Sequence, residues 1–295
     1  MQAAWMLAAS FFFASMAVGI KYASEQFGPL EIVFYRGIVG VVFMSVVMRV
    51  RGVSLRTTVP AMHVWRNIVG VAALVAWFYA IAGLPLATAM TLNYMSGVWI
   101  ATFLVAGTLV LGKLSDVRRQ GPLVLAVLCS FAGVVMMLRP TIEQNQLFAG
   151  LIGLLSGVLS GLAYMQVAAL GRVGEPETRT VFYFSLGATL AGLLGMLITG
   201  PHAWTWPAAG WLLPIGVLAV LGQLCMTRAY THGATMVVAN LQYAGIVFAS
   251  LYGLVLFHTQ IPLIGWAGMA LIVVSGIAAT FLRARAMPNP PVEEH

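Results

Sequence analysis

The sequence predicts an all-α integral membrane protein with ten transmembrane helices, arranged as two inverted five-helix repeats. Three observations lead to this prediction: a very apolar composition, long charge-free runs, and an internal offset of about half the chain. The 295 residues are 61% hydrophobic and 8% charged, whereas an average soluble domain is about 25% charged. So few charges cannot cover a water-facing surface. The composition therefore excludes a soluble enzyme, a disordered chain and a nucleic-acid-binding domain.

The charge-free runs set the expected spans, because a membrane-spanning helix needs about 20 mostly apolar residues. Proline and glycine divide the longer runs, at Leu84-Pro85, at Gly200-Pro201 with Pro207, and at Pro262. In chain order the expected spans are residues 3–22, 31–50, 63–83, 86–110, 118–138, 149–171, 179–200, 207–228, 233–257 and 261–282. They are apolar on every side, which is typical of helices embedded in lipid.

The basic residues set the expected orientation. Twelve Lys and Arg residues fall in the loops on one side, Lys21 and Arg139 fall on the other side, and Arg36 lies within the second span. Because cytoplasmic loops are enriched in cations, we expect an inner (plasma) membrane protein with both termini in the cytoplasm. The net charge of +7 is then a topology signal and not a nucleic-acid patch. The twelve are Arg49, Arg51, Arg56, Arg66, Lys113, Arg118, Arg119, Arg172, Arg179, Arg228, Arg283 and Arg285.

The chain ends and the cysteines carry weaker signals. The apolar segment 1–20 has no cation before it, which favours a retained first helix over a secretory signal. Residues 286–295 are rich in Pro and Glu and are expected to be a disordered cytoplasmic tail. Cys129 and Cys225 lie in apolar runs and are interpreted as packing residues. We expect no disulfide, no metal site and no cofactor.

An offset of 149 residues relates the two halves of the chain. It aligns Leu92-Asn93-Tyr94 with Leu241-Gln242-Tyr243, and Val33-Phe34-Tyr35 with Phe182-Tyr183-Phe184. This predicts one repeat over residues 1–145 and a second over 146–285. Because five spans is an odd number, the two repeats would lie in opposite orientations. Inverted repeats of this kind are typical of transporters, in which the substrate binds between the halves near the membrane midplane.

The pattern resembles the drug/metabolite transporter (DMT) superfamily, and within it the EamA-type ten-helix exporters. The segments that carry the resemblance are Ala80–Gly121 and Ala229–Gly268. Each has a small-residue turn, a polar and aromatic helix, a short loop and a glycine-containing helix. The chain has Gly112-Lys113 and Phe257-His258 where the family usually has a glutamate. The aromatic density of the spans is most similar to the YddG-like amino-acid exporters. The resemblance implies export of amino acids, possibly aromatic ones, by alternating access.

The positions of the charges bear on mechanism. None of the eight acidic residues lies in the middle of a span, which argues against proton or sodium coupling through a buried carboxylate. Arg36 lies at depth, five residues after Glu31. One interpretation is that Arg36 snorkels outward, or is capped by Glu31 or by backbone carbonyls. The other is a role in the pathway, such as holding a substrate carboxylate or a gate.

Uncharged polar residues are densest in the fourth and ninth spans. Amides in lipid must face helices or water, so these residues are predicted to line a central cavity; the alternative is that they join helices by hydrogen bonds. Aromatic residues of the third and sixth spans are further candidates. The candidate substrate-binding residues are Asn93, Tyr94, Trp99, Asn240, Gln242, Tyr243, Trp77, Tyr79, Tyr164 and Arg36.

Three functional classes fit a chain of this kind. The sequence favours a secondary transporter whose partners are a small-molecule substrate and the lipid bilayer, with a monomer possible. A lipid-modifying membrane enzyme and a channel are the alternatives. Against an enzyme, none of the five histidines belongs to a His-Glu-x-x-His motif, and there is no paired Asp or nucleophilic Ser motif. We therefore predict a protein that is not an enzyme.

Overall fold

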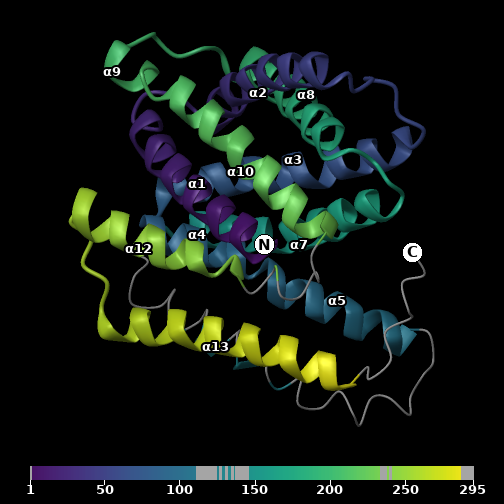
Figure 1. Cartoon of the computed structure of the whole chain (residues 1–295). Helices are drawn as coiled ribbons and strands as arrows, with labels where there is room; N and C mark the ends of the chain where they lie inside the picture. The colour runs from purple at the N-terminus through teal and green to yellow at the C-terminus, as the bar shows by residue number, and fades with distance from the viewer. Residues whose placement is uncertain are drawn as a thin grey trace. The chain divides into compact units, whose positions relative to one another are not determined.

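A computed structural model describes residues 2–110, 146–232 and 241–286, together with residues 125, 128–129, 132–133, 136 and 238. Within these ranges the chain forms helices and connecting turns and no strand (Figure 1). The helices are α1 (Gln2–Ala23), α2 (Pro29–Arg51), α3 (Pro60–Gly83), α4 (Leu86–Tyr94), α5 (Ser96–Val110), α7 (Leu147–Arg172), α8 (Glu177–Thr199), α9 (Trp206–Ala209), α10 (Leu212–His232), α12 (Ala244–Leu256) and α13 (Leu263–Ala286).

Six helical segments of the described chain are long and apolar enough to cross a membrane, and two shorter apolar helices follow. The six cover 4–23, 29–51, 60–83, 147–172, 177–199 and 206–232. They correspond to the first three expected spans and to the sixth, seventh and eighth. The expected fifth span lies largely outside the described residues, as does the expected tail. The chain is thus a multi-pass membrane protein.

Local sequence explains where these helices begin and end. α2 and α3 begin at Pro29 and Pro60, because the first turn of a helix does not need the N–H that proline lacks. α2 ends at Gly52, whose φ of 66° is a left-handed conformation that glycine adopts without a steric penalty. α8 ends at Thr199, and the Gly200 that follows has a φ of 78°, a positive value that glycine also adopts at low cost.

The described chain divides into two compact units. The first contains residues 1–96 and 142–260, and the second contains 97–141 and 261–295. Each unit draws on both of the repeats expected from the sequence, 1–145 and 146–285. The repeats are defined by sequence similarity, whereas the compact units are defined by contacts in space. The division into units therefore does not test the repeats, which stay a prediction.

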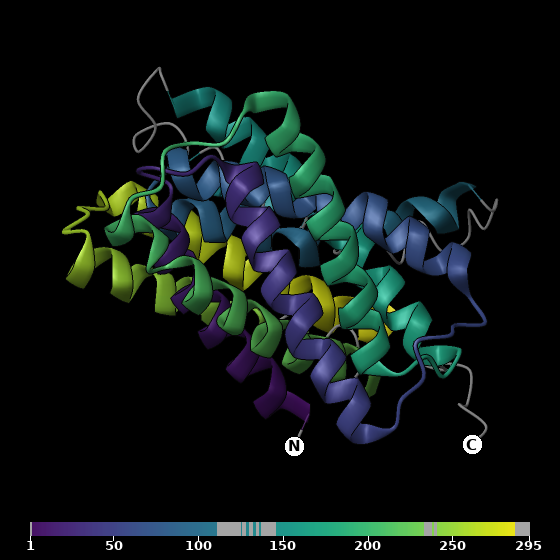
Figure 2. The same ribbon diagram turned by 90° about the horizontal axis from the view of Figure 1, so that it is seen from above.

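In the first unit, helices from the first half of the chain pack against helices from the second half. α1 packs along α10, α2 along α8, and α3 along α7, while α4 contacts α7 and α12 (Figures 1 and 2). Glycine permits the closest of these approaches. A Cβ at Gly37 would lie 2.6 Å from the backbone nitrogen of Thr189, and one at Gly192 would lie 2.7 Å from the Cα of Phe34. The α2–α8 contact therefore brings backbone against backbone.

The expected fourth span, residues 86–110, is interrupted in the structure. α4 ends at Tyr94, Met95 forms a turn, and α5 begins at Ser96. The following Ser96-Gly97 pair explains the interruption, because Gly and Ser weaken a helix. A second turn falls at Gln242 and Tyr243, directly before α12. The second unit has its own glycine contact, since a Cβ at Gly133 would lie 2.8 Å from the carbonyl oxygen of Gly268 in α13.

Candidate functional site

A small chamber with several polar groups in its wall lies inside the first unit, between α1, α2, α3, α4, α7, α8 and α10. Its volume is about 30 Å³, which is enough for one or two water-sized groups. The residues lining it are Phe13, Arg36, Arg66, Gly70, Ala73, Leu74, Trp77, Asn93, Tyr94, Ser160, Ala163, Tyr164, Phe184 and Gln223. Segments far apart in the sequence thus supply polar groups to one small space.

Two arginines dominate the chamber. Arg36 of α2 is 4% exposed and Arg66 of α3 is 3% exposed. Arg36 therefore does not snorkel to the surface, and Glu31 does not cap it. The Glu31 carboxylate instead accepts hydrogen bonds from the backbone N–H groups of Gly28 (2.9 Å) and His202 (2.8 Å) and contacts the His202 ring. Of the interpretations open for Arg36, these two are wrong.

Both guanidinium groups lie against the same aromatic ring. The Cζ atoms of Arg66 and Arg36 are 4.2 Å and 5.5 Å from the ring centroid of Phe184, and Arg36 is 5.9 Å from that of Phe78. Cation–π contacts contribute about 0.5–2 kcal/mol, whereas burying an unpaired charge costs several kcal/mol. The rings therefore offset only part of the cost of holding two cations in the protein interior.

Several nitrogen atoms of this pair have no hydrogen-bond partner. They are Nε of Arg36, and Nε and Nη1 of Arg66, all buried. Neither arginine has an acidic partner among the described residues, where the ion pairs involve Glu31, Glu175 and Glu177 instead. Buried charges in membrane segments are costly and typically mark functional positions. The two arginines are consequently the strongest functional signal in the structure.

From the sequence, Arg66 is expected among the cytoplasmic loop cations, and Phe184 appears only in the repeat alignment and not as a site residue. α3 begins at Pro60, so Arg66 lies in the second turn, about 9 Å along the helix axis. Gly70, four residues later, makes room for it, because a Cβ there would overlap Nη1 of Arg66. The signal available in the sequence was this Arg-x-x-x-Gly spacing within an apolar helix.

Asn93 lines the chamber and also joins two helices. Its Nδ2 donates hydrogen bonds to Oγ of Ser156 (3.1 Å) and of Ser160 (3.0 Å) on α7. The Ser156 hydroxyl in turn donates to the carbonyl of Gly153. The close approach of α4 and α7 depends on Gly157, where a Cβ would overlap the carbonyl oxygen of Leu92. The structure thus shows the helix-joining contacts of Asn93, and its part in substrate binding stays a prediction.

Gln242 is buried in a hydrogen-bonded group of tyrosines next to the chamber. Its Nε2 donates to the hydroxyl of Tyr164, and its Oε1 accepts from Tyr230, both at 3.3 Å. The rings of these two tyrosines stack with centroids 5.3 Å apart. Tyr243 is 4% exposed and its hydroxyl has no hydrogen-bond partner. Gln242 and Tyr243 do not line the chamber itself.

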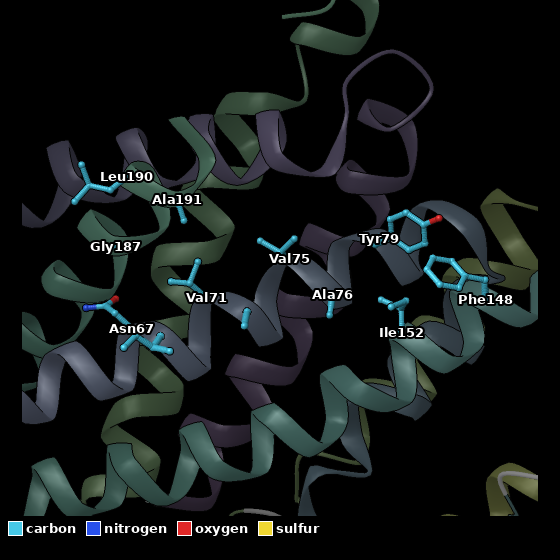
Figure 3. A pocket seen from close by; sticks show the side chains of 12 residues that line it. Asn67, Val71, Val75, Ala76, Tyr79, Phe148, Ile152, Gly187, Leu190 and Ala191 are labelled. Carbon is cyan, nitrogen blue, oxygen red and sulfur yellow. The ribbon is translucent and has the colours of Figure 1, made fainter. Parts of the chain in front are cut away.

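The other predicted residues lie in different places. Trp77, Tyr94 and Tyr164 line the chamber. Tyr79 instead lines an open apolar groove of about 790 Å³ between α3, α7 and α8 (Figure 3). Trp99 belongs to α5 in the second unit, where its ring stacks on Phe103. Asn240 lies outside the described residues.

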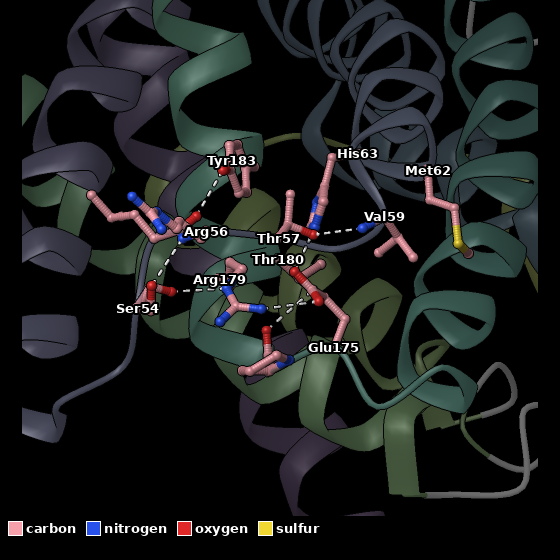
Figure 4. Close-up of polar contacts among 12 residues, drawn as sticks. Ser54, Arg56, Thr57, Val59, Met62, His63, Glu175, Arg179, Thr180 and Tyr183 are labelled. Atoms are coloured by element: carbon pink, nitrogen blue, oxygen red, sulfur yellow. Dashed lines mark hydrogen bonds and ion pairs between the residues drawn. The ribbon is translucent and has the colours of Figure 1, made fainter.

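A polar cluster ties the α2–α3 connection to the α7–α8 connection (Figure 4). Oε1 of Glu175 lies 2.8 Å from Nε2 of His63, and Oε2 accepts a hydrogen bond from Nη1 of Arg179. Arg179 also donates through Nε to the carbonyl of Ser54. Burial alone would raise the pKa of Glu175, but hydrogen bonds from His63, Thr57 and Arg179 lower it below its usual value.

Known proteins resemble the chain over almost its whole length. The pseudopaline exporter CntI of Pseudomonas aeruginosa is 36% identical over 272 residues, which cover 92% of each chain. An uncharacterized transporter of Helicobacter pylori is 30% identical with the same coverage, and a riboflavin transporter of Brucella anthropi is 23% identical over 91% of this chain and 94% of that protein.

A crystal structure at 19% identity covers 98% of this chain and 99% of its own, with a TM-score of 0.68, which shows a shared fold. No protein-family model matches the sequence. The relatives with known names are membrane transporters. The chain belongs to the family of membrane transporters that includes the pseudopaline exporter CntI.

Proposed function

We propose that the protein is a secondary transporter that exports amino acids or similar small metabolites from the cytoplasm by alternating access. The observation that carries this proposal is the buried chamber, which seven helices line and into which α2, α3 and α4 bring polar groups without hydrogen-bond partners. Small-molecule sites are enclosed spaces with a few convergent polar groups. The relatives support transport as the activity, and the chamber supports a polar organic substrate.

We further propose the ten-helix architecture of the EamA-type members of the drug/metabolite transporter superfamily, with inverted repeats 1–145 and 146–285. The packing pairs support it. In such a repeat spans 1 to 5 are equivalent to spans 6 to 10, so that α1 corresponds to α7 and α3 corresponds to α10. A contact between spans 3 and 6 should then be matched by a contact between spans 8 and 1. These are the α3–α7 and α10–α1 contacts, and both are present.

The helix interruptions also support the repeat. The turn at Met95 follows Leu92-Asn93-Tyr94, and the turn at Gln242 and Tyr243 falls within the aligned Leu241-Gln242-Tyr243. Transporters with inverted repeats commonly bind substrate where helices are interrupted at corresponding positions of the two halves. Tyr94 lines the chamber and Gln242 bonds to Tyr164, which also lines it. The two interruptions therefore support a substrate site in this part of the unit.

Flux measurement on the purified full chain in liposomes tests the proposal. Vesicles are loaded with a labelled amino-acid mixture or with a common metabolite, and efflux is compared with that from empty-membrane controls. We expect saturable, protein-dependent efflux of at least one compound. Equal efflux from vesicles with and without the protein, for every compound in the panel, would contradict the proposed function. Uphill export driven by an imposed pH gradient would contradict the prediction, made from the positions of the acidic residues, that transport is not coupled to protons.

A further inference from the structure

The chamber presents hydrogen-bond donors that lack acceptors. Besides the three arginine nitrogens, Nε1 of Trp77 and the hydroxyl of Tyr94 are buried without hydrogen-bond partners, and both residues line the same space. Guanidinium and indole groups are donors only. A buried donor without an acceptor is costly, so donors gathered around one cavity indicate a ligand that supplies acceptor oxygens.

The chamber also carries uncompensated positive charge. Arg36 and Arg66 both lie within 5.5 Å of the centroid of Phe184 and both line the chamber, so two cations border one space. Among the described residues, the carboxylates that form ion pairs do so elsewhere, with His63, Arg179, His202 and His232. Water could accept hydrogen bonds in this space but would leave the charge unbalanced. An anion satisfies both requirements.

We infer that Arg36 and Arg66 together bind carboxylate oxygens of the transported substrate, and that the site prefers organic acids and acidic amino acids over neutral or cationic compounds. This inference rests on the proposed function and names its substrate class. Arginine forms paired N–H···O bonds with a carboxylate, which fixes both charge and orientation. Because two guanidinium groups line one chamber, we expect a ligand with two carboxylates to bind with the highest affinity.

The size of the chamber indicates a closed form of the site. A volume of about 30 Å³ holds a carboxylate-sized group but not a whole amino acid. Phe184 of α8 lines the chamber, and both guanidinium groups lie over its ring. A ligand that displaces this ring from the guanidinium groups would widen the space while keeping the arginines paired with its oxygens.

Ligand-dependent thermal stabilisation of the purified full chain in detergent tests the inference. The probes are succinate, 2-oxoglutarate and glutamate, compared with glutamine, putrescine and sodium chloride at matched ionic strength. We expect the three acidic compounds to raise the melting temperature in a saturable way. Arg36→Gln and Arg66→Gln should each weaken this binding at least tenfold. The matched control is Arg56→Gln, because Arg56 is exposed on the α2–α3 connection, and it should bind as the wild type does.

The variants also separate a binding role from a structural one. Removing a buried unpaired charge should leave the ligand-free melting temperature unchanged or higher. Should a Gln variant fail to fold, Arg36→Lys and Arg66→Lys provide the test, because lysine keeps the charge but loses the paired donors. These variants should bind acidic compounds more weakly than the wild type does. Unchanged affinity in either replacement would overturn the inference, as would stabilisation by glutamine or putrescine equal to that by glutamate.

Three further outcomes bear on the inference, and the last two separate it from the proposed function. Stabilisation by chloride equal to that by the organic acids would identify a site for an inorganic anion and overturn the carboxylate assignment. Liposome efflux that persists in Arg36→Gln and Arg66→Gln would uphold transport and overturn the inference. Arginine-dependent binding of acidic compounds without efflux of any compound would uphold the site and overturn the proposed function.

Discussion

Nε2 of His63 lies 2.8 Å from Oε1 of Glu175, although the two residues are 112 positions apart in the sequence. The contact joins the first turn of α3 to the connection between α7 and α8. Both side chains are 4% exposed. The ring of His63 also lies 4.6 Å from that of Tyr183, whose hydroxyl donates to the carbonyl of Leu55. One carboxylate thus organises the contact between two connections of the first unit.

The first prediction concerns acid stability. Because hydrogen bonds from His63, Thr57 and Arg179 outweigh burial and lower the pKa of Glu175 below 4.5, the folded state holds this carboxylate ionised more strongly than the unfolded state does. Its contribution to stability is therefore present above pH 4.5 and is lost as the pH falls through the lowered pKa. We expect Glu175→Gln to flatten this part of the curve of melting temperature against pH.

The control for this prediction is Glu177→Gln. Glu177 is more exposed and its ion pair with His232 is longer, at 3.3 Å. We expect this variant to keep the acid dependence of the wild type. The same loss of stability below pH 4.5 in wild type and Glu175→Gln would mean that other groups set the acid limit.

The helical segments could be predicted from the sequence, whereas the chamber could be predicted only in part. Apolar runs and proline positions give the bounds of α2, α3 and α8 to within a few residues, because membrane helices are limited by length and polarity. The depth of Arg36 also follows from its position in a span. Arg66 and Phe184 could not be assigned, because their roles arise where α2, α3 and α8 meet. The His63–Glu175 pair is likewise a tertiary contact without a local signal.

The second prediction concerns Lys21, which counted in the sequence only as a cation of the outer loops. Its Nζ donates to the carbonyl oxygens of Ile81 (3.1 Å), Ala82 (3.0 Å) and Leu84 (2.8 Å) at the end of α3. A cation there satisfies carbonyls that the helix leaves unpaired and interacts favourably with the helix dipole. We expect Lys21→Met to lower the free energy of unfolding by about 1–3 kcal/mol.

Chemical denaturation in detergent measures this loss, with Arg49→Met as the matched control. Arg49 is an exposed residue in the last turn of α2, and the same change of a long cation to Met should alter stability by less than about 0.5 kcal/mol. Equal losses in the two variants would indicate that general charge, and not the carbonyl contacts, is responsible.

The third prediction uses two glycines of α12. A Cβ at Gly245 would overlap the ring of Tyr94, whereas the nearest atom to a Cβ at Gly253 is 4.0 Å away. We expect Gly245→Ala to cost about 1–3 kcal/mol, because the buried ring must shift. Gly253→Ala should be neutral or stabilising by up to about 1 kcal/mol, because alanine favours the helix. Melting temperatures of the two variants provide the comparison, and similar values would contradict the close packing of α12 on Tyr94.

The fourth prediction separates two roles of the amides. If Asn93 contacts substrate, Asn93→Leu should abolish efflux, whereas Ser156→Ala should preserve most of it, because Ser156 bonds to Asn93 but does not line the chamber. If Asn93 only joins α4 to α7, both changes should reduce stability and efflux together.

The same comparison applies to Gln242, with Gln242→Leu set against Tyr230→Phe, which removes one hydrogen-bond partner and keeps the ring stacked on Tyr164. Each lost buried bond costs about 1–3 kcal/mol when its partner is left unsatisfied, so melting temperature reports the helix-joining role directly. Efflux and melting temperature measured on the same preparations then distinguish the roles. We expect Asn93→Leu to lose efflux out of proportion to stability, because Asn93 lines the chamber, and Gln242→Leu to lose both in parallel, because Gln242 does not.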